Sequence, residues 1–284
     1  MTRKPKVAVL VLNRNLPEET DRLCARLEAD GGGMADVFVI ESGSAPDKRS
    51  RYCRWWANWP DAMDNGLRVS RGFNFGLGSL YGEGRFSDYE YLFLVCNDTE
   101  LKGPVIPVLV EEMERHQRLG ILSPCPENWG ELAIMPPKSS VYVWHIYLVA
   151  WMLRRRFVET MMTTEPPHHM NFLFDGTNFH GHYGDIELII KGYINDWATG
   201  LTNRALIRER SELLKEKADV MVTTPYDENL RRVIEEGRRW MKKKYGFTSR
   251  WQMQQFAILQ YNEFFRLNPD LRPYRLLKSA SQDG

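Results

Sequence analysis

The feature that most constrains the fold is a pair of short, fully apolar segments with one helical segment between them. Residues 7–12 read VAVLVL and residues 37–40 read VFVI, and both runs are rich in β-branched side chains. A continuous apolar run of this length is typical of a strand covered on both faces, as in a parallel sheet. Residues 18–29 have the leucine spacing of a helix and end at three glycines. This order predicts a right-handed βαβ unit and an α/β fold.

The same alternation of apolar and helical segments continues along the chain. The further predicted elements are a helix from residue 71, a strand at 91–95, a helix at 105–118, a strand at 121–124, a core strand followed by a helix within 141–152, and a helix at 185–191 closed by Gly192. From about residue 204 onward the chain is charged and helical in pattern. We therefore predict one α/β domain at 1–203 and a helical C-terminal extension at 204–284 packed on it.

Composition excludes several classes of protein. The chain has 284 residues, of which 43% are apolar, so it can bury a sizeable core. Lys and Arg number 38 against 37 Asp and Glu, which argues against a nucleic-acid partner. The four cysteines have neither zinc-site nor disulfide-framework spacing. The longest apolar stretch is too short to span a bilayer and no signal-type segment precedes the first strand, so we expect a cytoplasmic protein.

Polar side chains follow three predicted strands at the point where each strand ends: Asn13, Glu41 and Asp98. Ligands of open α/β sheets bind beyond the carboxyl ends of the strands. Glu41 is either an acceptor for ribose or base groups or a turn acid. Asp98 and Glu100 form a D-x-E pair, whose hard oxygens suit Mg²⁺ or Mn²⁺ bridging a diphosphate, and the alternative for Asp98 is a helix cap.

Five segments in a fixed order carry the most specific pattern. They are VAVLVLNRN, VFVIESGS, GFNFGL, YLFLVCNDTEL and GHYGDIELIIKGY, all within about residues 5–200. This series resembles the family 2 glycosyltransferases with the GT-A fold. The resemblance implies a central, mostly parallel, Rossmann-like sheet flanked by helices. It also implies an inverting transfer of a hexosyl or deoxyhexosyl group from a nucleoside-diphosphate sugar to a glycan or lipid-linked acceptor, as in polysaccharide biosynthesis.

The resemblance also implies a nucleotide site, residue by residue. Asn13 and Glu41 would flank the base and ribose, with Glu41 where an Asp is usual. Asn74 would lie against the nucleotide, and Arg71 would reach a phosphate. Asp98 would be the acid that binds a divalent metal, Mg²⁺ or Mn²⁺, next to the diphosphate.

Inverting transfer also needs a carboxylate that takes the proton of the acceptor hydroxyl. The resemblance assigns this role to Asp185, which begins a helix and follows Gly184 where a Glu is usual. The positive end of the helix dipole favours its ionised form, and the alternative is a plain N-cap. Nearby, His180 and His182 are candidates for metal or sugar contacts, and Trp197 is a candidate for sugar stacking.

Two other functions stay open at this stage. A nucleotidyltransferase also uses an α/β sheet, although residues 13–15 are not its Gly-rich basic loop. A non-catalytic nucleotide- or carbohydrate-binding module is the other, because Cys96 stands where the first acid of a D-x-D pair is usual. Finally, the basic segment 231–245 is either a solvated helix face or a peripheral contact with an anionic membrane surface that carries lipid-linked acceptors.

Overall fold

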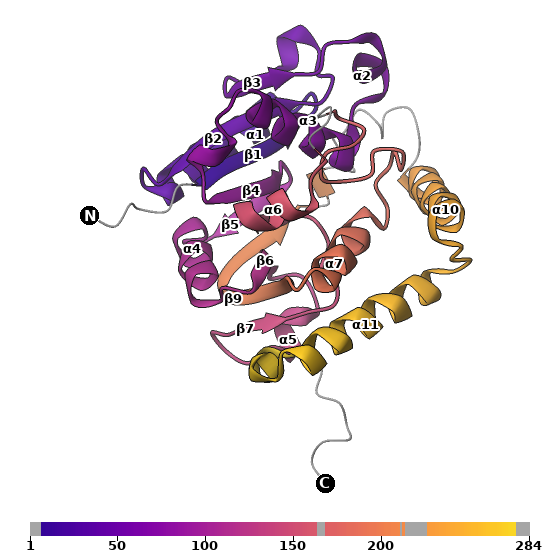
Figure 1. Cartoon of the computed structure of the whole chain (residues 1–284). Helices are drawn as coiled ribbons and strands as arrows, with labels where there is room; N and C mark the ends of the chain where they lie inside the picture. The colour runs from indigo at the N-terminus through magenta and orange to yellow at the C-terminus, as the bar shows by residue number, and fades with distance from the viewer. Residues whose placement is uncertain (1–6, 164–167, 211, 214–225, 277–284) are drawn as a thin grey trace.

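The computed structural model describes residues 7–163, 168–210, 212–213 and 226–276. Within these residues nine strands form one mixed sheet with the order β3-β2-β1-β4-β8-β6-β9-β5, and β7 pairs with β9 (Figure 1). The strands are β1 (Val7–Asn13), β2 (Ala35–Glu41), β3 (Cys53–Trp56), β4 (Tyr91–Cys96), β5 (Thr99–Lys102), β6 (Leu119–Pro126), β7 (Ser140–Tyr142), β8 (Ala150–Arg154) and β9 (Ala198–Glu209). The strands predicted from residues 7–12, 37–40, 91–95 and 121–124 are all present.

Helices flank this sheet (Figure 1). They are α1 (Pro17–Gly31), α2 (Pro60–Asn65), α3 (Arg68–Gly82), α4 (Ile106–Arg115), α5 (Glu131–Ile134), α6 (Arg155–Met161), α7 (Gly184–Ile194), α10 (Tyr226–Tyr245) and α11 (Arg250–Leu267), with short 3₁₀ turns at Pro46–Lys48, Phe86–Asp88 and Pro269–Tyr274. Strands β3, β2, β1 and β4 are mutually parallel. The β1–β2 and β3–β4 connections run in opposite directions across the sheet, so right-handed crossovers place α1 and α3 on opposite faces.

Helix α3 lies unusually close to the sheet at two glycines. A Cβ atom on Gly72 would come within 2.4 Å of the Leu12 side chain. One on Gly76 would come within 2.2 Å of the Ile40 side chain. The glycines of the GFNFG segment therefore allow the helix to pack on β1 and β2.

Three sequence expectations are wrong in detail. Residues 141–152 are not a strand followed by a helix, because β7 and β8 occupy their ends and pair with β9 and with β4 and β6. Gly192 does not close α7 but lies inside it, where the helix packs against Phe157. Strand rather than helix follows residue 204, because β9 continues to Glu209 and pairs with β5. The division of the chain near residue 203 stays a prediction.

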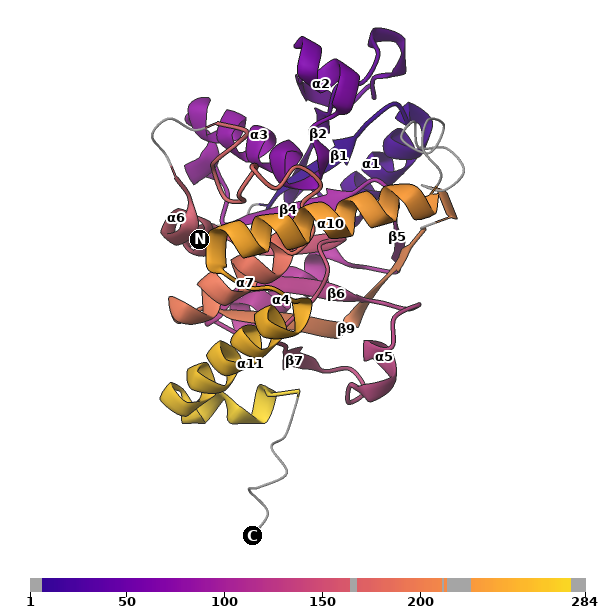
Figure 2. The ribbon, with the colours of Figure 1, turned by 90° about the vertical axis from the view of Figure 1, so that its right-hand side faces the viewer.

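The two C-terminal helices are fixed in different ways. Helix α11 begins with a capping box between Ser249 and Gln252 and packs beside α7. Its Tyr261 hydroxyl donates a hydrogen bond to the Tyr142 carbonyl oxygen at 2.8 Å, which ties the helix to β7. Helix α10 crosses the molecule in front of the sheet (Figure 2). Among the helices that the structure describes, none is long and apolar enough to cross a membrane.

Candidate functional site

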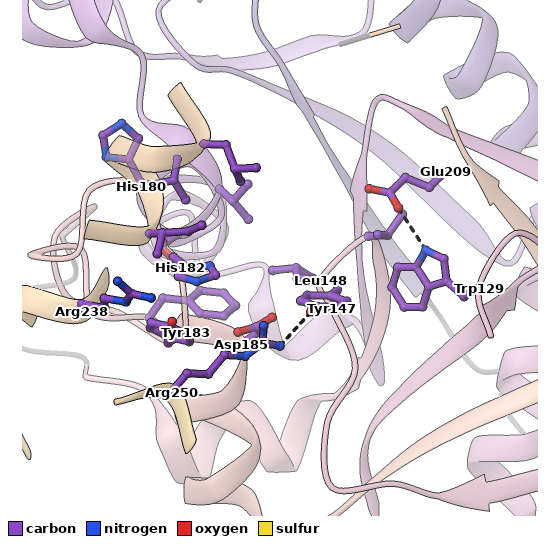
Figure 3. Close-up of a pocket in the computed structure, with 18 of the residues that line it drawn as sticks. Trp129, Tyr147, Leu148, His180, His182, Tyr183, Asp185, Glu209, Arg238 and Arg250 are labelled. Carbon is purple, nitrogen blue, oxygen red and sulfur yellow. Dashed lines mark hydrogen bonds between the residues drawn. The ribbon is translucent and has the colours of Figure 1, made fainter. Parts of the chain in front are cut away.

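A cavity of about 800 Å³ lies between α10, the first residue of α11, the start of α7 and the chain between β7 and β8 (Figure 3). Its volume is in the range of small-molecule sites. The labelled lining residues are Trp129, Tyr147, Leu148, His180, His182, Tyr183, Asp185, Glu209, Arg238 and Arg250. Segments far apart in the sequence thus form one cavity.

Asp185 lies in the first turn of α7 and lines this cavity. Its side chain is 15% exposed, and its Oδ1 accepts a hydrogen bond from the Ile186 amide at 2.8 Å. Its Oδ2 lies 3.7 Å from Nε2 of His145, a nitrogen that is buried without a hydrogen-bond partner among the described residues. The helix is capped by Tyr183, with φ of 73°, and not by the Asp185 side chain. The N-cap interpretation of Asp185 is therefore wrong, and its carboxylate faces the cavity.

Asp98 lies in the short link between β4 and β5, and it is only 4% exposed. Its Oδ1 is buried and has no hydrogen-bond partner among the described residues. Burial, and then the charge of Glu209, raise the pKa of Asp98 to about 6. Glu209 is opposite Thr99 in the β5–β9 register, and its Oε2 accepts a hydrogen bond from the Trp129 indole at 3.1 Å. The Asp98 carboxylate thus interacts with that of Glu209, and Glu209 lines the cavity while Asp98 lies behind it.

This pair fits a divalent cation. An unpartnered buried oxygen on Asp98 and a neighbouring carboxylate on Glu209 are the hard ligands that Mg²⁺ and Mn²⁺ prefer. In the described ranges no group of three or more His, Cys, Asp or Glu side chains could hold a metal. A cation held here would therefore take its other ligands from substrate or water.

Asn13 and Glu41, predicted to flank the nucleotide, lie in a buried polar network at the ends of β1 and β2. The Asn13 amide donates to Glu41 Oε2 at 2.9 Å, and the Ser50 amide donates to Glu41 Oε1 at 2.7 Å. Ser44 also donates to Glu41, which is fully buried. Burial raises the pKa of Glu41, although these donors oppose the shift. The network extends toward Asp98, since Asn97 donates to Asn13 Oδ1 at 3.1 Å.

Asn74 and Arg71 of α3 hold the chain that precedes α7. The Asn74 amide donates to the carbonyl oxygens of His169 and Phe174, and its Oδ1 accepts from the amides of Leu173 and Phe174 at 2.9 Å. Arg71 Nε donates to the Gly176 carbonyl oxygen at 2.7 Å. Both side chains therefore position the loop that leads to Asp185. Their predicted contacts with nucleotide and phosphate stay predictions.

Helix α10 is pinned to this loop and to α7 along its length. The carboxylate of Glu236 accepts from the Phe179 amide at 2.6 Å and contacts the His180 imidazole. Near the helix end, the Trp240 indole donates to Asp175 at 3.1 Å, and Lys244 Nζ lies 2.7 Å from Glu187 Oε1. One face of the predicted basic segment thus makes structural contacts, and other residues of the same helix, among them Ile234 and Arg238, line the cavity.

The histidine and tryptophan candidates differ in their position relative to the cavity. His180 and His182 line the cavity, while Trp197 does not, because it packs against Phe157 at the other end of α7. Sequence reasoning missed Glu209 and Trp129. Neither stands in a recognisable motif, and only the sheet topology brings them to the cavity.

Comparisons with known proteins define the fold. No protein-family model matches the chain, and no curated protein matches its sequence. The structure is similar to GalNAc-T7 solved with UDP, GalNAc and Mn²⁺, with a TM-score of 0.57 and 8% identity, over 96% of this chain and 59% of that chain. Mycobacterium tuberculosis glucosyl-3-phosphoglycerate synthase, with Mn²⁺, UDP-glucose and phosphoglyceric acid, matches at a TM-score of 0.49 and 13% identity, over 84% of this chain and 79% of that one. S. aureus TarS matches at a TM-score of 0.48 and 10% identity, over 95% of this chain and 50% of that chain.

The architecture is therefore that of the GT-A glycosyltransferases, as the sequence predicts. This chain spans about three fifths of the GalNAc-T7 chain that it matches.

Proposed function

We propose that this protein is an inverting, GT2-like glycosyltransferase that moves a sugar from a nucleoside-diphosphate sugar to an acceptor hydroxyl. The observation that carries the proposal is one cavity in a GT-A fold that is lined by Asp185 and by Glu209, with Asp98 beside Glu209. The reaction requires a proton acceptor, for which we propose Asp185, and a cation close to the leaving group, for which we propose Glu209 with Asp98 behind it.

In this proposal Asp185 is the general base. Its Oδ2 takes the proton as the acceptor oxygen attacks the anomeric carbon, and the bond from that carbon to the diphosphate oxygen breaks. Asp185 lies in the first turn of α7, and its carboxylate lines the cavity that would take the acceptor. Its fixed hydrogen bond to the Ile186 amide leaves Oδ2 for the acceptor.

We assign Asp98 and Glu209 to the side of the site that binds the sugar donor. Asp98 and Glu209 would hold Mn²⁺ or Mg²⁺, which, when bound, neutralises the charge of the departing nucleoside diphosphate. The Asn13–Glu41 network, which contacts Asn97, fixes the backbone beside Asp98 and would border the base and ribose. The acceptor, glycan or lipid-linked, would enter from the side of Asp185.

The test is calorimetric titration of the full chain with UDP, GDP and dTDP, each with and without Mn²⁺. Nucleotide binding that Mn²⁺ strengthens in wild type, but not in Asp98→Asn, supports the transferase. Glu100→Gln is the matched control, because this acid two residues away is exposed and its carboxylate is paired with Lys102. Sugar binding without nucleotide binding would instead support a carbohydrate-binding module. Turnover of a nucleoside triphosphate with a sugar phosphate would support a nucleotidyltransferase.

A further inference from the structure

The walls of the cavity differ in charge from one end to the other. Arg238 of α10 and Arg250 of α11 line the end where Asp185 lies, together with His182 (Figure 3). Glu209 lies across the cavity from them (Figure 3). The Asp185 end thus carries two guanidinium groups near one carboxylate, while the opposite wall carries Glu209.

Neither guanidinium group forms a salt bridge with a described residue. Arg250 Nη2 donates to the Tyr147 hydroxyl at 3.1 Å, and no carboxylate lies within 4.0 Å of it in the described ranges. Arg238 has neither a hydrogen bond nor an ion pair with any residue that the structure describes. Lys244, further along α10, differs because its ammonium is paired with Asp175.

The charges of Arg238 and Arg250 both act on the His182 imidazole. Burial lowers the pKa of His182, Asp185 raises it, and Arg250 and Arg238 lower it further. His182 is therefore neutral near pH 7, so the two arginines supply the fixed positive charge there. A planar guanidinium presents paired N–H donors that match the oxygens of a phosphate group.

We propose that this end of the cavity binds a phosphate group of the acceptor, with Arg238 and Arg250 as its ligands. The inference rests on the proposed function and names the acceptor class, a phosphorylated alcohol or sugar. Because both arginines line the cavity beside Asp185, the acceptor would carry its phosphate close to the hydroxyl that reacts. The diphosphate of the donor belongs to the opposite wall, with Asp98 and Glu209.

The experiment measures binding of matched probes to the full chain at low salt. Glucose 6-phosphate and glucose differ only in the phosphate, inorganic phosphate tests the group alone, and geranyl phosphate tests a lipid source. We expect glucose 6-phosphate or geranyl phosphate to bind at least about tenfold more tightly than glucose. Arg238→Gln and Arg250→Gln should each weaken phosphate binding about tenfold to a hundredfold. Arg239→Gln, an exposed neighbour on α10 that does not line the cavity, should leave it unchanged.

Equal binding of glucose and both organic phosphates, absence of phosphate binding, or unchanged affinity in both variants would overturn the proposal. The same preparations are titrated with UDP and Mn²⁺. A loss of UDP affinity without a loss of glucose 6-phosphate affinity would also overturn it, since the arginines would then serve the donor. Arginine-dependent phosphate binding in a wild type that does not bind UDP would reject the transferase function and retain the phosphate site.

Discussion

Replacing Asp98 with Asn should stabilise the protein at neutral pH, although we assign this acid to the donor site. The ionised form is disfavoured in the folded state because the side chain is 4% exposed and lies near Glu209, and its pKa of about 6 is above the value of 3.8 for an unperturbed Asp. A difference of about 2 pKa units corresponds to about 3 kcal/mol. A residue that lowers stability in this way is typical of a functional site.

Because the pKa of Asp98 is raised in the folded state, the pH range over which the stabilities of wild type and Asp98→Asn diverge can be stated. Below about pH 3 the carboxyl group is protonated in both the folded and the unfolded state, because both pKa values lie higher, so wild type and Asp98→Asn should differ by a constant amount. As the pH rises to about 6 and above, the wild type loses up to about 3 kcal/mol relative to the variant. Above pH 7 the gap should again be constant.

The assay is urea unfolding of both proteins between pH 4 and 8 in the presence of a chelator. Glu100→Gln is the control, because Lys102 lowers the pKa of that exposed acid and removing its charge gives no stabilisation at neutral pH. Adding Mn²⁺ at neutral pH should then stabilise the wild type and not Asp98→Asn. A free-energy gap that does not change with pH would refute the argument that Asp98 is an energetically costly buried charge.

Three further predictions follow from the site. Asp185→Asn should lower sugar-transfer turnover by about 10²–10⁴ while UDP affinity and stability stay near wild type; an active, stable variant would remove Asp185 from the mechanism. Asn74→Ala should cost about 2–4 kcal/mol in urea unfolding, because four hydrogen bonds to residues 169–174 are lost, and unchanged stability would show that this loop is held by other contacts. Glu41→Gln should weaken UDP binding about tenfold or more in calorimetry and cost about 1–3 kcal/mol of stability, because an amide nitrogen would face the donors on Asn13 or Ser50; a variant with normal UDP affinity would exclude Glu41 from the nucleotide site.

The first half of the fold could be predicted because its pattern is local. Runs such as residues 7–12 and 91–95 are apolar enough to be buried strands in almost any packing, and the helix after the first strand has a clear glycine stop. The prediction of a strand and a helix within residues 141–152 was wrong, because a continuous apolar run has no periodicity that distinguishes a strand from a helix. The prediction that Gly192 ends a helix was wrong, because a glycine inside a helix can allow close packing as well as mark a helix end.

Sequence could predict only those residues of the candidate site that stand in a family-like motif. Asp185 and Asp98 stand in such motifs, and the structure puts the first in the cavity and the second beside the cavity-lining Glu209. Glu209 gives no local signal, because its proximity to Asp98 depends on the pairing of β9 with β5. Arg238 was visible only as one charge in a basic helix, and sequence does not say which face of that helix turns inward.

The pairing of β5 with β9 also sets when the site can exist during synthesis. Leu101 pairs with Ile207, so the strand that follows Asp98 must wait for more than one hundred further residues to leave the ribosome. Strands β1, β2 and β4 lie earlier in the chain and are neighbours in the sheet, so their pairing needs no later segment. Closing such a long loop is slow compared with forming local contacts. A nascent chain that ends before residue 206 therefore keeps the Asp98 carboxylate in water, and the unfavourable burial of this charge is deferred to the last strand of the sheet to be made.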